Sequence, residues 1–133
     1  MEILKNSTVA IFGIGGVGSF ATESLARAGI YNLVLIDNDI VNITNINRQI
    51  HADFSTINKP KVEIMKERIL KINPNANVTV YQEFFNSESS NKLISNKYNY
   101  IVDAIDSVSS KIELIKIAKE KNIPIISSMG ARK

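Results

Sequence analysis

Cysteine is absent from this sequence, and histidine occurs once among its 133 residues. Without cysteine the chain cannot carry a disulfide framework, a thiolate metal site or a cysteine nucleophile. Long apolar runs are also missing, since none approaches the ~20 residues that a membrane-spanning helix needs. The first residues lack the basic end, apolar stretch and cleavage site of a signal peptide. We therefore expect a cytoplasmic protein that makes no contact with a membrane.

Arginine is scarce, with four residues against twelve lysines, within a net charge of +3. This charge allows an acidic partner, but the composition does not indicate arginine-based recognition of nucleic acid. The chain is otherwise ordinary for a globular protein, at 44% hydrophobic and 22% charged residues. One core is usual for roughly 100–200 residues, so we expect residues 1–133 to form a single domain. Such a domain has room for a cofactor and leaves little chain for a second, substrate-binding domain.

Short β-rich runs alternate with segments of helical period, which is typical of parallel βαβ units. Apolar residues recur at helical spacing in the first helix, at Val17, Phe20, Ala21, Leu25 and Ala28. The last helix is expected to point Ile112, Ile115 and Ala118 inward. The sequence predicts an α/β fold, a Rossmann-like three-layer sandwich whose parallel sheet has the strand order 3-2-1-4-5. The expected strands are 8–12, 33–36, 78–81, 100–105 and 123–127, and the expected helices are 17–28, 60–72, 87–95 and 108–121, with a loop and a short helix around 44–50 between them.

Chemically useful residues follow three of these strands. Gly13–Gly18 come after the first strand, Asp37 after the second and Asp106 after the fourth. In the predicted strand order the carboxyl ends of the first and fourth strands lie side by side, where such sheets bind ligands. We therefore expect all three to line one crevice.

The glycines Gly13, Gly15, Gly16 and Gly18 form the pattern G-x-G-x-x-G between a strand and a helix. The first glycine permits a tight turn, the second lets a phosphate approach the backbone, and the third allows close packing of the helix. The helix N-terminus adds free N–H donors for an anion. Asp37, 19 residues beyond Gly18, can accept hydrogen bonds from ribose hydroxyls. The pattern predicts nucleotide binding.

The glycine pattern taken alone favours NAD, but the polar loop favours another nucleotide. Asn45 and Arg48 lie in that loop, Lys61 follows it, and Asp106 at the far rim can hold a divalent metal. Cations, an amide and a carboxylate around a phosphate cradle suit a triphosphate with Mg²⁺ better than a hydride carrier. The alternative interpretation of Arg48 and Lys61 is a solvated surface charge.

Six motifs in register carry a resemblance to a known superfamily. Beside the glycine pattern they are LIDND at 35–39, NINRQ at 45–49, KPK at 59–61, INP at 72–74 and DAID at 103–106. This series resembles the ATP-dependent activating enzymes related to ubiquitin-activating enzymes and the bacterial proteins that adenylate sulfur-carrier proteins. NRQIHA at 47–52 and DAIDSV at 103–108 are most similar to the tRNA threonylcarbamoyladenosine dehydratase branch.

The resemblance implies two chemical stages and a role for each site residue. A carboxylate, in this branch that of threonylcarbamoyladenosine in tRNA, attacks the α-phosphorus of ATP, and the substrate's own nitrogen then displaces AMP to close a ring. Asn45, Arg48 and Lys61 are implied to contact the phosphates, and Asp37 the ribose. Arg48 and Lys61 are implied to stabilise the departing pyrophosphate, and Asp106 to bind Mg²⁺.

Three other functions stay open at this point. One is the adenylation of a ubiquitin-like sulfur-carrier protein, with a carrier or sulfur-transfer protein as partner. The second is an NAD-dependent dehydrogenase domain, and the third a non-catalytic nucleotide-sensing or dimerisation module. The family resemblance also implies a homodimer for the full-length form.

Several other residues are better explained by structure than by catalysis. His51 is expected to cap or pack within the polar loop, and Asp103, inside an apolar strand, needs hydrogen-bond donors. Tyr98 and Tyr100 are expected to pack. The lysines of the last helix are expected to form a solvated face, with Lys111, Lys116, Lys119 and Lys121 as its members.

The chain departs from the family pattern at both ends. Family members carry an upstream helix with an arginine that reaches the ATP of the partner subunit, whereas Arg27 is the first arginine of this sequence. They also continue well past the strand expected at 123–127. We therefore expect a nucleotide-binding half, truncated at both ends, that turns over poorly alone.

Overall fold

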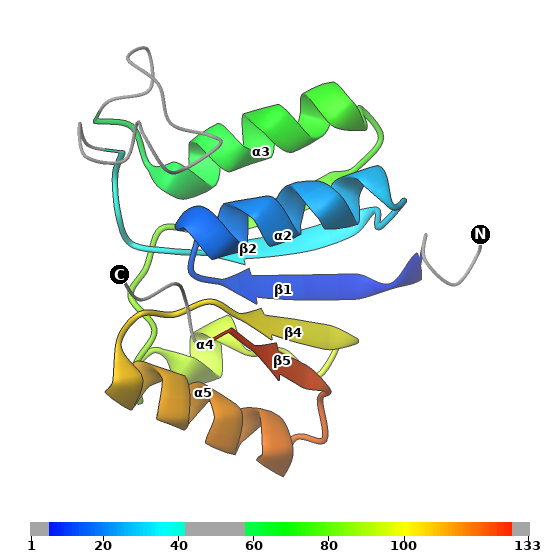
Figure 1. Ribbon diagram of the computed structural model, residues 1–133. Coiled ribbons are helices and arrows are strands. Elements are labelled where there is room, and N and C mark those ends of the chain that lie inside the picture. Colours follow the sequence, from blue (N-terminus) through cyan, green and yellow to red (C-terminus); the bar gives the residue numbers. More distant parts are fainter. Residues whose placement is uncertain (1–5, 42–57, 129–133) are drawn as a thin grey trace.

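A computed structural model of the protein describes residues 6–41 and 58–128. Strands and helices alternate along these residues (Figure 1). The strands are β1 (Thr8–Phe12), β2 (Asn32–Ile36), β3 (Asn77–Tyr81), β4 (Tyr100–Asp103) and β5 (Ile125–Ser127). The helices are α2 (Gly16–Arg27), α3 (Lys61–Ile72), α4 (Ser90–Leu93) and α5 (Val108–Glu120). The short helix expected around residues 44–50 lies outside the described residues.

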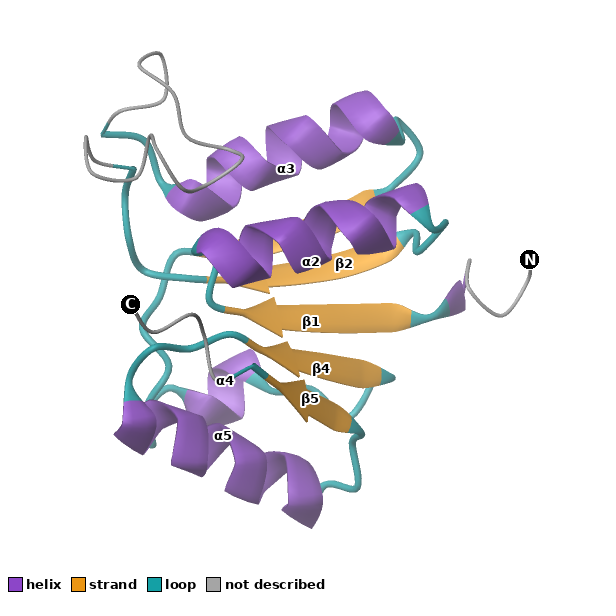
Figure 2. Ribbon diagram, in the orientation of Figure 1, coloured by secondary structure: helices purple, strands orange, loops and turns teal. Residues whose placement is uncertain are grey.

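The five strands form one sheet in the order β3-β2-β1-β4-β5, and every pair in it is parallel. This confirms the predicted strand order. Because the strands run the same way, their carboxyl ends share one edge of the sheet (Figure 2). β1 stands between β2 and β4, so the segments that follow these three strands are neighbours at that edge.

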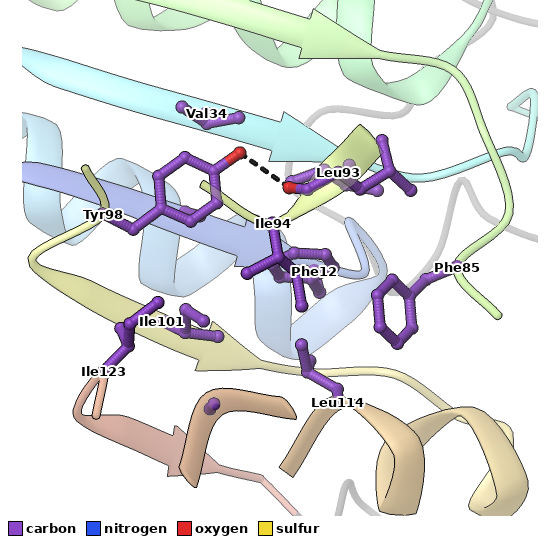
Figure 3. Close-up of a cluster of buried hydrophobic side chains, with 12 residues drawn as sticks. Phe12, Val34, Phe85, Leu93, Ile94, Tyr98, Ile101, Leu114 and Ile123 are labelled. Carbon is purple, nitrogen blue, oxygen red and sulfur yellow. Dashed lines mark hydrogen bonds between the residues drawn. The ribbon is translucent and has the colours of Figure 1, made fainter. Parts of the chain in front are cut away.

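Each face of the sheet carries its own hydrophobic core, because side chains alternate along a strand. Val9 and Ile11 of β1 pack with residues of α2 and α3. Ala10 and Phe12 pack with residues of α4 and α5 on the opposite face. The second core includes an edge-to-face contact between Phe12 and Phe85, with ring centroids 5.2 Å apart (Figure 3). These two cores make the three-layer α/β sandwich that the sequence predicts.

Tyr98 belongs to the hydrophobic core between the sheet and helices α4 and α5. Its ring is buried and its hydroxyl donates a hydrogen bond of 2.7 Å to the carbonyl of Leu93 (Figure 3). Burial raises the pKa of Tyr98 to about 12. The expected packing role of this tyrosine is confirmed.

The apolar side predicted for α2 packs only in part, since Leu25 contacts the core but Val17 and Phe20 do not. Val17 and Phe20 are 39% and 63% exposed, while the buried residues are Gly18, Ser19, Thr22 and Ala26. Small side chains let the helix approach the sheet closely, and Thr22 satisfies its hydroxyl by donating to the Gly18 carbonyl at 2.7 Å. Close approach therefore overrides the hydrophobic pattern in this helix.

The prediction for the last helix was also wrong in part. Ala118 of α5 is fully buried as predicted, but Ile112 is 61% exposed and Leu114 is fully buried in its place. The strand expected at 100–105 ends at Asp103, because the Asp103 carboxylate accepts a hydrogen bond from the backbone N–H of Ile105 at 3.1 Å and turns the chain. Among the described residues, no helix is both long enough and apolar enough to span a bilayer.

Candidate nucleotide-binding site

Backbone packs directly on backbone in the turn after β1. Gly13 has a φ of 98°, and its N–H donates to the carbonyl of Ile36 at 2.8 Å. A Cβ on Gly13 would lie 2.5 Å from the Ala104 carbonyl oxygen, and a Cβ on Gly18 would lie 1.7 Å from the Gly13 oxygen. Both positions therefore require glycine. The turn is joined in this way to the start of α2 and to the segment after β4.

The same turn leads straight into the N-terminus of α2. Gly15 is the residue that precedes the helix, without a capping side chain, and Gly16 is its first helical residue. The first N–H groups of a helix have no partner within it and lie at the positive end of its dipole. The glycine pattern thus places the N-terminus of α2 at the carboxyl edge of the sheet, as its spacing predicts.

Asp37 joins this turn to the end of β2. One carboxylate oxygen accepts from the N–H of Ile14 at 2.6 Å, and the other accepts from the N–H of Asp39 at 2.7 Å. Burial raises the pKa of the Asp37 carboxyl above its usual range, although the two backbone hydrogen bonds and the nearby Lys61 ammonium oppose the shift. Each carboxylate oxygen can accept a further hydrogen bond, so hydroxyl groups of a ligand have acceptors here.

Lys61 lies beside the same strand end, at the start of α3. Its Nζ is 3.6 Å from Oδ2 of Asp39, and its backbone N–H donates to the Asp39 carbonyl at 3.0 Å. The Lys61 side chain is 7% exposed and that of Asp39 is 61% exposed. The structure thus brings Lys61, Asp37 and the glycine turn together at one edge of the sheet.

Asp106 lies in the segment between β4 and α5, two residues after Ala104, whose carbonyl oxygen a Cβ on Gly13 would meet. Its side chain is exposed. It forms no hydrogen bond or ion pair with the other described site residues. Within residues 6–41 and 58–128, no group of three or more histidine, aspartate or glutamate residues could hold a metal ion.

Three residues singled out in the sequence, Asn45, Arg48 and His51, lie outside the described residues. Their assignment to the phosphates, or to packing in the case of His51, stays a prediction.

A buried ion pair at the end of β4 supplies the donors that Asp103 needs, and its lysine is one that the sequence places on a solvated face. Asp103 is fully buried, and its Oδ2 accepts hydrogen bonds from Lys111 Nζ at 3.0 Å and from the Ser127 hydroxyl at 2.8 Å. Lys111 also donates to the Ser128 carbonyl at 2.6 Å. Lys111 is buried, so it does not belong to the solvated lysine face that the sequence predicts. A carboxylate inside an apolar strand requires such a partner, and this requirement was the one signal in the sequence.

This geometry fits a nucleotide. One edge of the sheet brings together a glycine cradle without side chains at Gly13 and Gly18, the free N–H groups of a helix, a carboxylate with spare acceptors at Asp37 and a sheltered cation at Lys61. The first two suit phosphate, the third suits ribose hydroxyls, and the cation neutralises phosphate charge.

Known proteins that resemble this chain agree with a nucleotide-binding site. Residues 1–132 match the ThiF family. The tRNA threonylcarbamoyladenosine dehydratase of Bacillus subtilis is 49% identical over 131 residues, which are 98% of this chain and 52% of that protein. An adenylyltransferase and sulfurtransferase of Saccharomyces cerevisiae is 35% identical over 127 residues, covering 96% of this chain and 29% of that protein.

A solved structure matches as well. The Escherichia coli tRNA N6-threonylcarbamoyladenosine dehydratase in complex with ATP has a TM-score of 0.95 and 43% sequence identity, over 98% of this chain and 54% of that one. The chain thus spans about half the length of the bacterial dehydratases it matches.

Proposed function

The chain belongs to the ThiF family, and from this we propose that its site binds ATP and activates a carboxylate by adenylation. One observation carries the proposal. The glycine turn, Asp37 and Lys61 meet at the sheet edge of a fold that matches an ATP-bound relative at a TM-score of 0.95. Binding of ATP, in place of the NAD that the glycine pattern alone favours, is supported by the same match.

The substrate we propose is the threonylcarbamoyladenosine of tRNA. The identity of 49% to a dehydratase that acts on this nucleoside extends over 98% of the chain. A carboxylate oxygen of the threonyl group attacks the α-phosphorus of ATP, the bond from that phosphorus to the bridging oxygen breaks, and pyrophosphate leaves. A nitrogen of the substrate then attacks the activated carbonyl carbon, and AMP leaves as the ring closes. The sum is loss of water from the substrate, driven by ATP.

The chain's own residues hold and orient the reactants. Asp37 accepts hydrogen bonds from the ribose, and the N–H groups at the start of α2 face the phosphates. Lys61 and Arg48 place positive charge where negative charge develops on pyrophosphate, and Asn45 adds an amide contact. Fixed donors and cations stabilise a transition state because they need no reorganisation during the reaction. No cysteine is needed in this scheme, and the sequence has none.

Asp106 is the residue we propose for Mg²⁺. Its exposed carboxylate offers the oxygen ligand that Mg²⁺ prefers, and phosphate oxygens or water would complete the coordination. Bound there, the ion would neutralise charge on the phosphates.

We propose that residues 1–133 are the nucleotide-binding domain of a longer protein. In this proposal the full-length form is a cytoplasmic homodimer, and the chain alone turns over poorly.

ATP–pyrophosphate exchange in the full-length protein tests the function. Exchange is expected only when tRNA bearing threonylcarbamoyladenosine is present, and Arg48→Ala and Asp106→Ala are each expected to reduce it by a factor on the order of 10²–10³. Normal exchange in either folded variant would contradict the assigned roles. Tighter binding of NADH than of Mg·ATP in calorimetry would instead favour the dehydrogenase reading.

A second function has its own support. The identity of 35% to the yeast adenylyltransferase and sulfurtransferase favours activation of a carrier protein, which would be the partner in that case. AMP release stimulated by a carrier ending in Gly-Gly, and not by modified tRNA, would identify this function. Binding of ATP without exchange in the presence of either substrate would indicate a nucleotide-sensing module.

A further inference from the structure

Asp39 is an acidic residue placed against a cation that the proposed function assigns to phosphate. Its Oδ2 is 3.6 Å from Nζ of Lys61, and among the described residues this is the ion pair that Lys61 forms. The lysine side chain is sheltered, at 7% exposed, whereas the aspartate side chain is open to solvent at 61%. A triphosphate arriving from solvent therefore meets a lysine that already has a carboxylate partner.

The backbone keeps this pair together. The N–H of Lys61 donates to the carbonyl of Asp39 at 3.0 Å, and the N–H of Asp39 donates to the carboxylate of Asp37 at 2.7 Å. An isolated antiparallel bridge joins Ile40 to Pro60, the residues next to the pair. Asp39 is thus held beside Lys61 by its main chain, and its side chain alone is free to turn away.

We propose that Asp39 is the counter-ion that the phosphates of ATP replace. In the nucleotide-free protein Asp39 holds the Lys61 ammonium, and binding exchanges this carboxylate for phosphate oxygens. When pyrophosphate leaves, Asp39 takes the ammonium back. Asp39 is therefore a positioning residue that acts through Lys61, and it lowers the affinity for phosphate groups that must be released. This inference rests on the proposed function.

If phosphate replaces Asp39 beside Lys61, removing the Asp39 charge should raise the affinity for phosphate, whereas structural damage should lower it. Asp39→Asn keeps the size of the side chain and both backbone hydrogen bonds, but it removes the competing charge. We expect Asp39→Asn to bind tripolyphosphate roughly two- to fivefold more tightly, the range expected for losing a partly exposed ion pair. A variant that merely distorted the turn would bind phosphate more weakly.

The test is isothermal titration of tripolyphosphate and of adenosine into the wild type and three variants. Glu63→Gln is the matched control, because Glu63 is exposed in the first turn of α3 and makes the same change of charge without an ion pair to a described residue. Asp39→Glu restores the charge and is expected to return the affinity toward that of the wild type. Adenosine affinity is expected to be equal in all four proteins.

Each result decides the question. The proposal is supported if Asp39→Asn binds tripolyphosphate more tightly than the wild type and Glu63→Gln does not. Equal affinities in Asp39→Asn and wild type, equal gains in Asp39→Asn and Glu63→Gln, or a loss of affinity in folded Asp39→Asn would overturn it and leave the proposed function standing. Failure of the wild type to bind tripolyphosphate would contradict the proposed function and this inference together.

Discussion

Asp37 shows how one side chain can serve both the fold and a ligand. Its two carboxylate oxygens accept hydrogen bonds from Ile14 and Asp39, and these bonds fix the glycine turn to the end of β2. Replacing Asp37 by Asn turns one acceptor into a donor that faces a backbone N–H. We expect Asp37→Asn to weaken adenosine binding about tenfold or more, as for loss of hydrogen bonds to a charged group. Calorimetry with adenosine measures this, and unchanged affinity in the folded variant would exclude a ribose contact.

The titration of Asp37 gives a second test. Burial raises the folded-state pKa of Asp37 above 3.8, so its ionisation favours the unfolded chain. The stability that Asp37 contributes is therefore present below pH 3.8 and is lost as the pH rises through the raised pKa. We expect the free energy of unfolding of the wild type, relative to Asp37→Asn, to fall across this window in chemical denaturation. If the unfolding free energy of the wild type relative to Asp37→Asn rises with pH instead, the pKa of Asp37 is lowered in the folded protein.

Lys111 offers a stability test without any ligand. Its ammonium lies among Asp103, the Ser128 carbonyl and the end of β5, and Lys111→Met would leave the fully buried Asp103 charge without its cation. Breaking a buried pair in this way costs about 3–5 kcal/mol, and the Ser127 hydroxyl offsets only part of that.

The matched control lies on the same helix. Lys116 is exposed on α5, so Lys116→Met is expected to change the stability by about 0.5 kcal/mol or less. Urea denaturation of both variants measures the difference. Equal stabilities would mean that Lys111 is solvated, as the hydrophobic pattern of α5 suggested.

At the scale of the element, the close packing of α2 on the glycine turn requires that Gly18 has no side chain. Alanine normally favours a helix over glycine by about 1 kcal/mol, yet a Cβ at Gly18 would lie 1.7 Å from the Gly13 oxygen. We expect Gly18→Ala to destabilise the protein by about 2 kcal/mol or more.

Gly29 provides the comparison for this prediction. It has a φ of 103°, and a Cβ there meets nothing within 4 Å, so Gly29→Ala is expected to cost only backbone strain of about 1 kcal/mol. Denaturation curves of the two variants compare them directly. A stabilised Gly18→Ala would contradict the close packing of α2 on the turn.

The elements themselves were predictable, and their packing faces were less so. Strand order, the glycine turn and the position of Asp37 follow from β-rich runs, glycine spacing and the rules of parallel sheets. The buried side of α2 did not follow, because Gly18, Ser19 and Thr22 are buried for their small size while Phe20 is exposed. Lys111 was misplaced for a related reason, since its partner Asp103 is eight residues away on another element and no helical period encodes that contact. The pairing of Asp39 with Lys61 was likewise not predictable, because the two residues are far apart in the sequence and meet where Ile40 pairs with Pro60.

At the scale of the whole molecule, topology assembles the site. β1 lies between β2 and β4, so the residues that follow three separate strands meet at one edge of the sheet. In our account this edge binds ATP and transfers its adenylyl group to a carboxylate.

Tracing one oxygen atom tests that claim most directly. When the full-length protein acts on tRNA whose threonylcarbamoyladenosine carboxylate carries heavy oxygen, one labelled oxygen should appear in AMP, because the attacking oxygen stays on the α-phosphorus when the ring closes. Label in inorganic phosphate with release of ADP would instead mean activation at the γ-phosphorus. Unlabelled AMP would mean that the carboxylate never attacks phosphorus, and either result would contradict adenylation at this site.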